Sequence, residues 1–232
     1  MVAAIRKPDS SSIQEQLDGR GYARLGRLLT DRQADSLRSQ FANDQKFRSH
    51  IVMRRHGYGE GEYKYFDYPL PNKVASLRDE LYALLVPVAN EWQENLRSEM
   101  RFPATHAEFL ARCHRDGQLR PTPLILRYKS GDYNRLHQDL YGAHVFPLQV
   151  VVLLSDESDF TGGEFVLTEQ RPRMQSRVEV VGLKKGHGVA FAVNERPQSG
   201  ARGYYRVKMR HGVSELRSGE RYTLGIIFHD AA

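Results

Sequence analysis

Apolar residues recur at helical spacing through much of the first half of the chain. Residues 73–101 place Leu77, Leu81 and Leu84 three or four positions apart, and residues 106–115 form a second periodic stretch. Side chains at this spacing lie on one face of an α-helix. The pattern therefore predicts two helices that bury an apolar face.

Two shorter helices are expected nearer the start of the chain, because a capping signature precedes each of them. Thr30 stands three residues before Gln33, so its hydroxyl can cap a helix while the Gln33 side chain reaches back to the cap amide. Ser12 and Glu15 repeat this spacing before the first helix. Residues 22–25 lie between the two helices and are predicted to form a strand.

From Pro121 onward the pattern changes to short runs rich in β-branched and aromatic residues, separated by turn-forming sequences. Closely spaced strands predict an α+β protein with a double-stranded β-helix (jelly-roll) core, and we expect the N-terminal helices to pack on the outer face of its sheet. The expected division is a mainly helical portion at 1–120 and a β core at 121–232, within one integrated domain. The predicted strands are residues 124–128, 146–154, 164–168, 178–183, 189–193, 205–210 and 222–228.

The composition is that of a folded protein, with 232 residues of which 40% are hydrophobic and 10% aromatic. No apolar run approaches the roughly 20 residues needed to cross a bilayer, and we expect no secretory signal. The single cysteine, Cys113, cannot form an internal disulfide and is expected to be a packed helix residue. These features favour a cytoplasmic protein that is not bound to a membrane.

The charge is basic, with a formal net charge of +6 at pH 7 and a sequence pI of about 9.4. Such a balance permits attraction to nucleic acid or to acidic substrates. Because the basic residues are spread along the chain, they indicate a charged surface rather than a disordered arm. Charge alone therefore does not identify a partner.

The candidate chemistry begins with His137 and Asp139, which stand two residues apart. Alternate side chains of an extended backbone share a face, so both can point into the mouth of a β-barrel. Two imidazoles and one carboxylate suit one face of Fe(II), and His211 can supply the second imidazole. Arg221, ten residues after His211, can hold a carboxylate of a bidentate co-substrate. This ordered set predicts an oxygenase.

The β half of the chain resembles the catalytic core of Fe(II)/2-oxoglutarate-dependent dioxygenases, most closely the prolyl-4-hydroxylase type. The resemblance covers about half of the chain, from Pro121 to the C-terminus. Its individual motifs are loose, but they are specific in combination. They are the segment from Leu126 to Asp139, the turn Thr161-Gly162-Gly163-Glu164-Phe165, the segment His211-Gly212-Val213 and the segment Gly219-Glu220-Arg221-Tyr222-Thr223-Leu224.

The resemblance implies a metal site and a co-substrate site. His137, Asp139 and His211 would be the catalytic ligands of Fe(II). Arg221 would pair with the C5 carboxylate of 2-oxoglutarate, and Thr223 would add a hydroxyl to the same carboxylate.

Tyr128 matches a tyrosine that often donates a hydrogen bond to the co-substrate in this superfamily. Prolyl hydroxylases commonly have a lysine where Arg221 stands. The arginine retains carboxylate binding but changes its geometry, because a guanidinium is a rigid fork.

The implied reaction is oxidative decarboxylation of 2-oxoglutarate with dioxygen, which gives succinate and carbon dioxide and hydroxylates a substrate C–H bond. The β half is most similar to an uncharacterised bacterial group described as oxygenases suspected of oxidative demethylation of damaged nucleic acid. Dealkylating repair enzymes typically carry a second arginine six residues after the co-substrate arginine. This chain has Ile227 at that position, which distances it from those enzymes.

Two basic segments could contact a nucleic-acid substrate. Residues 52–65 combine arginines, tyrosines and glycines and could form a lid, because aromatic rings stack on a flipped base. Residues 171–177 form a basic loop that suits phosphate contacts. In both segments the alternative is a solvated loop without a ligand. The candidate substrate-binding residues are Arg54, Arg55, Tyr58, Arg171 and Arg173.

Three classes of function remain open at this point. The protein could be an oxygenase that removes an N-alkyl group from nucleic acid, a hydroxylase of a protein side chain or small metabolite, or a binding module without turnover. The complete ligand set argues against the third. A basic, aromatic groove leading to His137 would favour nucleic acid, and a narrow apolar pocket would favour a small molecule.

Overall fold

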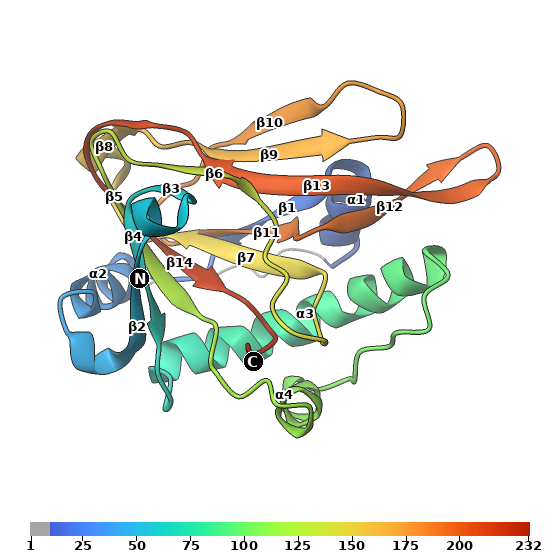
Figure 1. Cartoon of the computed structure of the whole chain (residues 1–232), viewed down its shortest axis with the longest axis horizontal. Helices are drawn as coiled ribbons and strands as arrows, with labels where there is room; N and C mark the ends of the chain where they lie inside the picture. Colours follow the sequence, from blue (N-terminus) through green and yellow to red (C-terminus); the bar gives the residue numbers. More distant parts are fainter. Residues whose placement is uncertain (1–9) are drawn as a thin grey trace, which may run out of the picture.

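Two antiparallel β-sheets lie face to face in the computed structural model, which describes residues 10–232 (Figure 1). The helices are α1 (Ser10–Arg20), α2 (Asp31–Gln40), α3 (Asn72–Asn95) and α4 (His106–Arg115), with short 3-10 turns η1 (Asp44–Lys46), η2 (Met53–His56) and η3 (Glu157–Asp159). The strands are β1 (Tyr22–Arg27), β2 (Phe47–Val52), β3 (Gly59–Glu60), β4 (Glu62–Phe66), β5 (Leu124–Lys129), β6 (Tyr133–His137), β7 (Leu148–Leu153), β8 (Phe160–Gly162), β9 (Phe165–Gln170), β10 (Arg177–Val181), β11 (His187–Ala192), β12 (Glu195–Gly200), β13 (Gly203–Val213) and β14 (Leu216–Ile226).

The larger sheet has eight strands in the order β1-β11-β7-β14-β5-β4-β2, with β8 paired to β14. The smaller sheet has six strands in the order β10-β9-β13-β6-β3, with β12 paired to β13. Most neighbours come from distant parts of the sequence, as in a jelly roll, although β9 and β10, and β12 and β13, are consecutive hairpins. The double-stranded β-helix core predicted from the sequence is confirmed.

Strand β7 shows how the layers are held together, because all six of its residues are buried. Val150 and Val152 belong to the apolar cluster that also contains Trp92 of α3. Val151 faces the other way and packs with Phe165 between the two sheets. The helices α3 and α4 thus cover the outer face of the larger sheet, as predicted (Figure 1).

The local signals in the sequence are largely accurate. Thr30 caps α2 through the predicted reciprocal bonds with Gln33, and Cys113 is buried in α4. Ser12 was expected to cap the first helix, but α1 begins at Ser10 and therefore contains Ser12. None of the helices formed by residues 10–232 is long and apolar enough to cross a membrane.

The long helix is shorter than predicted and does not reach residue 101. It ends at Asn95, with Leu96 as its C-terminal cap. Arg97 has a φ of 55°, a left-handed conformation that an α-helix cannot continue through.

Residues 47–66, for which no strand is predicted from the sequence, contribute to both sheets. Strand β4 pairs with β5 and with β2 in the larger sheet, and β3 pairs with β6 in the smaller one. Most of the expected lid segment, residues 52–65, is therefore ordered structure rather than a free loop. The division at residue 120 stays a prediction, and strands from both sides of it share each sheet.

Candidate metal centre and co-substrate pocket

A cavity of about 400 Å³ lies between the two sheets. It is lined by the residues of both the predicted metal site and the predicted co-substrate site. Strands β14, β5 and β4 of the larger sheet form its floor, because every second side chain along each strand points into the cavity. Arg221 on β14 is paired with Tyr128 on β5. Thr223 is paired with Leu126 on β5, which is paired in turn with Tyr63 on β4. All five residues line the cavity. The three residues predicted to bind 2-oxoglutarate are thus brought together on one face of the larger sheet.

The next row of the floor consists of Gly225, Leu124 and Tyr65. A Cβ atom on Gly225 would lie 2.6 Å from Cδ2 of Leu124, which real Cβ atoms essentially never approach. The glycine therefore lets Leu124 lie across β14. The row ends at the ring of Tyr65, which is 9% exposed.

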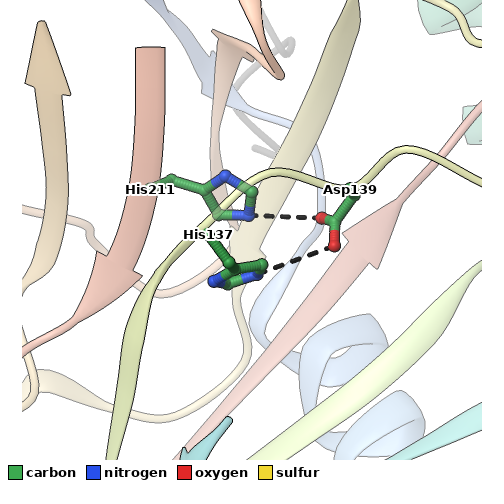
Figure 2. A group of neighbouring side chains, drawn as sticks. All are labelled: His137, Asp139 and His211. Carbon is green, nitrogen blue, oxygen red and sulfur yellow. Dashed lines mark ion pairs between the residues drawn. The ribbon is translucent and has the colours of Figure 1, made fainter. Parts of the chain in front are cut away.

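The side chains of the three candidate metal ligands point toward one another, as Figure 2 shows. His211 on β13 is paired in register with His137 at the end of β6, and Asp139 follows two residues later. One ligand atom from each side chain can be chosen so that all three lie within 4.8 Å of one another. The Nε2 atom of His211 lies 3.2 Å from Oδ2 of Asp139, and that of His137 lies 3.6 Å from Oδ1.

The residue between the two ligands, Gln138, makes hydrogen bonds to neighbouring elements. The side-chain amide of Gln138 donates to the carbonyl oxygen of Met209 at 2.8 Å and to Oδ1 of Asn194 at 2.6 Å. These bonds tie the segment after β6 to β13 and to the connection between β11 and β12. They hold the backbone so that His137 and Asp139 remain on the cavity side.

Hydrogen bonds also orient the ligands. Nδ1 of His137 lies 2.7 Å from the carbonyl oxygen of Arg135, which can only accept, so Nδ1 carries the hydrogen and Nε2 is free for a metal. The hydroxyl of Tyr141 donates to Oδ1 of Asp139 at 2.7 Å. The hydroxyl of Tyr65 lies 3.4 Å from that of Tyr141 and can donate to it.

The electrostatics of the site favour the protonation states that bind a divalent metal. Burial would by itself raise the pKa of Asp139, but the hydrogen bond and charge of His211 and the charge of His137 hold it well below its usual range. Burial and the nearby His211 lower the pKa of His137. The site therefore presents a carboxylate and a neutral imidazole near neutral pH.

Arg221 is the second notable feature of the cavity, because it is 2% exposed and its Nη1 atom has no hydrogen-bond partner. No ion pair joins it to a carboxylate of residues 10–232. Burial lowers its pKa to about 10, so it remains protonated at neutral pH. The hydroxyl of Tyr128 is also buried without a partner, and its ring centroid lies 5.8 Å from the guanidinium carbon.

The predicted glycine turn makes room for this arginine. Gly163 has a φ of 64°, which L side chains rarely adopt. A Cβ atom there would lie 2.5 Å from Cδ1 of Leu216 and 3.0 Å from Cδ of Arg221. The Gly162-Gly163 turn thus shapes the wall beside Arg221.

The structure separates the five candidate substrate-binding residues. Tyr58 lines the cavity and is 50% exposed at its rim. Arg54 and Arg55 lie nearby on η2, and Arg54 pairs with Glu60 rather than facing the cavity. Arg171 and Arg173 lie on the loop between β9 and β10 and do not line the cavity. The substrate role of all five residues stays a prediction.

Four further cavity residues bear on the site, and none was named individually as a site residue, although two of them lie in the predicted lid segment, residues 52–65. Tyr141 continues the alternation of His137 and Asp139, so its spacing could have indicated it. Tyr63 and Tyr65 alternate with polar residues in a strand-like pattern, but nothing local says that this strand joins the catalytic sheet. Gln149 stands in an apolar run and carries no signal except its polarity. The four residues are Tyr63, Tyr65, Tyr141 and Gln149.

The fold is that of 2-oxoglutarate/Fe(II) oxygenases of the prolyl-hydroxylase type. A prolyl-4-hydroxylase from Pseudomonas putida superposes with a TM-score of 0.57 at 13% identity, covering 97% of this chain and 100% of its own. An oxidoreductase of the 2OG-Fe(II) oxygenase family from Burkholderia pseudomallei gives 0.54 at 15% identity, covering 98% and 95%. A prolyl hydroxylase from Trichoplax adhaerens, in complex with a peptide fragment of hypoxia inducible factor, gives 0.50 at 13%, covering 93% and 86%.

Within this class, the chain belongs to the Oxygenase-NA family, described as an oxygenase catalysing oxidative methylation of damaged DNA, whose model matches residues 61–231. Uncharacterised proteins from two strains of Mycobacterium tuberculosis are 51% identical over 168 residues, which is 72% of this chain and 72% of theirs. The family resemblance noted in the sequence is confirmed.

Proposed function

We propose that this protein is an Fe(II)/2-oxoglutarate-dependent dioxygenase that oxidises the N-alkyl group of an alkylated base in DNA or RNA. The proposal combines three sources of support: the family to which the chain belongs, its jelly-roll fold and the two sites in one cavity. Dioxygen is the expected oxidant, and nucleic acid is the expected partner. The protein is expected to act in the cytoplasm.

The observation that carries the proposal is the buried, unpaired guanidinium of Arg221. A buried charge without a counterion typically costs about 3–5 kcal/mol, so such a group is retained where a ligand completes it. A dicarboxylate fits, because one carboxylate can pair with Arg221 and accept from the hydroxyl of Tyr128, while Thr223 offers a further hydroxyl. Its other end can reach the metal site in the same cavity.

The chain's own residues would bind and orient the reactants. His137, Asp139 and His211 would hold Fe(II) on one side and leave the side facing the cavity open. Together the metal, 2-oxoglutarate and dioxygen supply the oxidising chemistry, in which one oxygen atom enters succinate and the other the substrate. Arg221 and Tyr128 would fix the co-substrate at its far end, and the apolar lining would exclude water.

The product of an oxidised N-methyl group follows from simple chemistry. Hydroxylation of the methyl carbon gives an N-hydroxymethyl group, whose C–N bond then breaks to release formaldehyde and leave the N–H base. A family described as acting on damaged DNA, a net charge of +6 and several tyrosines in the cavity favour this substrate class.

A second candidate is hydroxylation of a protein side chain or small metabolite. The shared fold with prolyl hydroxylases favours it, and one of those structures holds a peptide. The two candidates use the same metal and co-substrate. They differ only in the molecule that stimulates turnover.

The test is iron-dependent formation of succinate from 2-oxoglutarate in the presence of methylated oligonucleotides, peptides or metabolites. Asp139→Ala should lose this activity to background while keeping its thermal unfolding transition, because a metal ligand is removed. Asp35→Ala, an exposed aspartate on α2, is the matched control and should behave as the wild type. Turnover at the wild-type rate in Asp139→Ala would contradict the assignment of Asp139 as a metal ligand.

A further inference from the structure

Gln149 is a buried polar residue that the two sites above do not use. It is 4% exposed, lines the cavity, and its amide nitrogen has no hydrogen-bond partner among residues 10–232. Most buried polar groups in native proteins are hydrogen-bonded, so an orphaned amide in a cavity wall requires an explanation. A ligand that accepts a hydrogen bond would provide one.

The position of Gln149 sets it apart from the co-substrate anchor. It lies one residue beyond the Val150–Ile226 pair of β7 and β14, which places it beside Ile227. Ile227 is six residues along the chain from Arg221, or about 20 Å for an extended strand. A five-carbon diacid anchored at Arg221 does not span that length of sheet.

Gln149 is nevertheless close to the metal site. Its register partner on β11 is Phe191, and the Phe191 ring lies 4.7 Å from the imidazole of His211, centroid to centroid. The amide thus lines the cavity beside a residue that contacts the candidate ligand His211, and apart from Arg221. This is where the reacting group of a substrate has to be held.

Aromatic side chains form the wall around this part of the cavity. Tyr65 and Tyr141 pack with Leu124 and Ile227 in one apolar cluster. The ring of Tyr63 meets that of Tyr65 edge to face, with centroids 5.4 Å apart and an interplanar angle of 85°. Tyrosine rings and the unpartnered Gln149 amide therefore line one cavity, and among residues 10–232 its lining has Asp139 as the only acidic group.

We propose that Gln149 and the tyrosines Tyr63, Tyr65 and Tyr141 form a subsite for one extruded nucleobase. The rings contact the faces of the base, and the Gln149 amide pairs with a donor–acceptor edge, as glutamine does with adenine. The inference rests on the proposed function and refines it. A prolyl ring has neither a flat aromatic face nor such an edge, so the subsite favours nucleic acid over a prolyl peptide.

Direct binding tests the proposal without relying on turnover. The probe is a single-stranded pentanucleotide with 1-methyladenine at its centre, titrated by calorimetry into anaerobic protein loaded with Fe(II) and 2-oxoglutarate. Gln149→Leu should raise the Kd of this probe about tenfold, the loss of one good hydrogen bond. Its Kd for 2-oxoglutarate should change less than twofold. Its Tm should be equal or higher, because the variant removes an unsatisfied buried group.

The aromatic wall provides a second set of variants that keep the fold. Tyr63→Leu should weaken probe binding about tenfold or more, whereas Tyr63→Phe, which keeps the ring, should stay within about threefold of the wild type. The matched controls lie outside the cavity: Gln93→Leu on α3 and Tyr204→Leu, an exposed residue of β13. Neither control should change the Kd of the probe.

Three outcomes would overturn the inference. Gln149→Leu could weaken 2-oxoglutarate binding as much as probe binding, which would assign the amide to the co-substrate. It could lower the Tm and leave probe binding unchanged, which would make the amide structural. The wild type could bind a short proline-rich peptide and not the pentanucleotide. That last outcome would overturn the proposed substrate class together with the subsite, whereas the first two would overturn the subsite alone. Failure of the proposed dioxygenase chemistry would instead appear as no 2-oxoglutarate binding and no succinate.

Discussion

Two buried arginines differ sharply in what surrounds them, although they are exposed to nearly the same degree, 1% for Arg78 and 2% for Arg221. Arg78 lies on α3 at the interface with the larger sheet. Its Nε donates to the carbonyl oxygen of Ile227 at 2.8 Å, its Nη1 to the hydroxyl of Tyr68 at 3.3 Å, and its Nη2 to Asp230 at 2.7 Å. Each of its nitrogens has a partner.

Arg221 has the same charge and burial without such partners. The contrast teaches that burial by itself does not distinguish a structural charge from a functional one. A buried charge whose bonds are all made within the chain holds elements together. A buried charge with an orphaned nitrogen in a cavity wall indicates a ligand of opposite charge.

The largest expected effect comes from Arg78→Leu, which should lower the free energy of unfolding by about 3–5 kcal/mol. The substitution leaves Asp230 buried without its main counterion. Urea denaturation followed by circular dichroism measures this loss. A change below about 1 kcal/mol would show that Arg78 does not have the structural role assigned to it here.

Arg221→Leu is the matched substitution in the cavity, and its effect should fall on binding instead. The Kd for 2-oxoglutarate should rise about 100-fold, because a charge-assisted contact is lost. The free energy of unfolding without ligand should stay equal or increase, since an uncompensated charge is removed. Iron affinity should change little. Equal losses of iron and 2-oxoglutarate binding would contradict the assigned role.

The region around Arg78 should also respond to pH. Burial, with the charge of Arg78, lowers the pKa of His229 to about 4 from the usual 6.5. As pH falls below 6.5 the unfolded chain takes up this proton, while the folded chain does not until about pH 4. Stability is therefore lost across that window, by about 2 kcal/mol between pH 7.5 and 5 from this residue.

Unfolding curves at these two pH values measure that dependence. The His229→Gln variant, which does not titrate, is the comparison. Its loss of stability on acidification should be about 2 kcal/mol smaller than that of the wild type. Identical slopes in the two proteins would show that His229 is not held neutral by its surroundings.

The smallest effect is expected from Tyr141→Phe in the cavity. The phenol donates to Asp139 and holds its carboxylate in place, so its loss should weaken Fe(II) binding about tenfold. Metal titration monitored by quenching of intrinsic fluorescence measures this affinity. Tyr204→Phe is the matched control and should bind iron as the wild type does.

Much of the site could be predicted from the sequence, because its candidate ligands occur in pairs two or ten residues apart along the chain. His137, Asp139, His211 and Arg221 were identified from order and distance along the chain, and the structure brings them to one cavity. Two of the strands that carry them were predicted in part, as 205–210 and 222–228, but β6, which ends at His137, was not predicted as a strand. Their roles as ligands stay predictions until binding is measured.

The remainder depends on contacts between distant segments, which no local pattern encodes. The residues 47–66 join the sheets only because β5 and β6 offer them free edges, and polar residues such as Lys64 break the expected apolar pattern. Lys64 is buried all the same, since its ammonium group donates to Phe41 and Asp44. Gln149 becomes informative only once its lack of a partner is known.

The pairing of β4 with β5 has a consequence for how this protein could change over time or be re-engineered. The candidate metal and co-substrate ligands come from residues after 121, whereas Tyr63 and Tyr65 lie on the β2–β4 hairpin, from an earlier part of the chain. The hairpin borders the larger sheet and contributes no metal ligand. A library confined to residues 47–66 could therefore alter substrate range as an exchangeable cassette while every candidate metal and co-substrate ligand is retained.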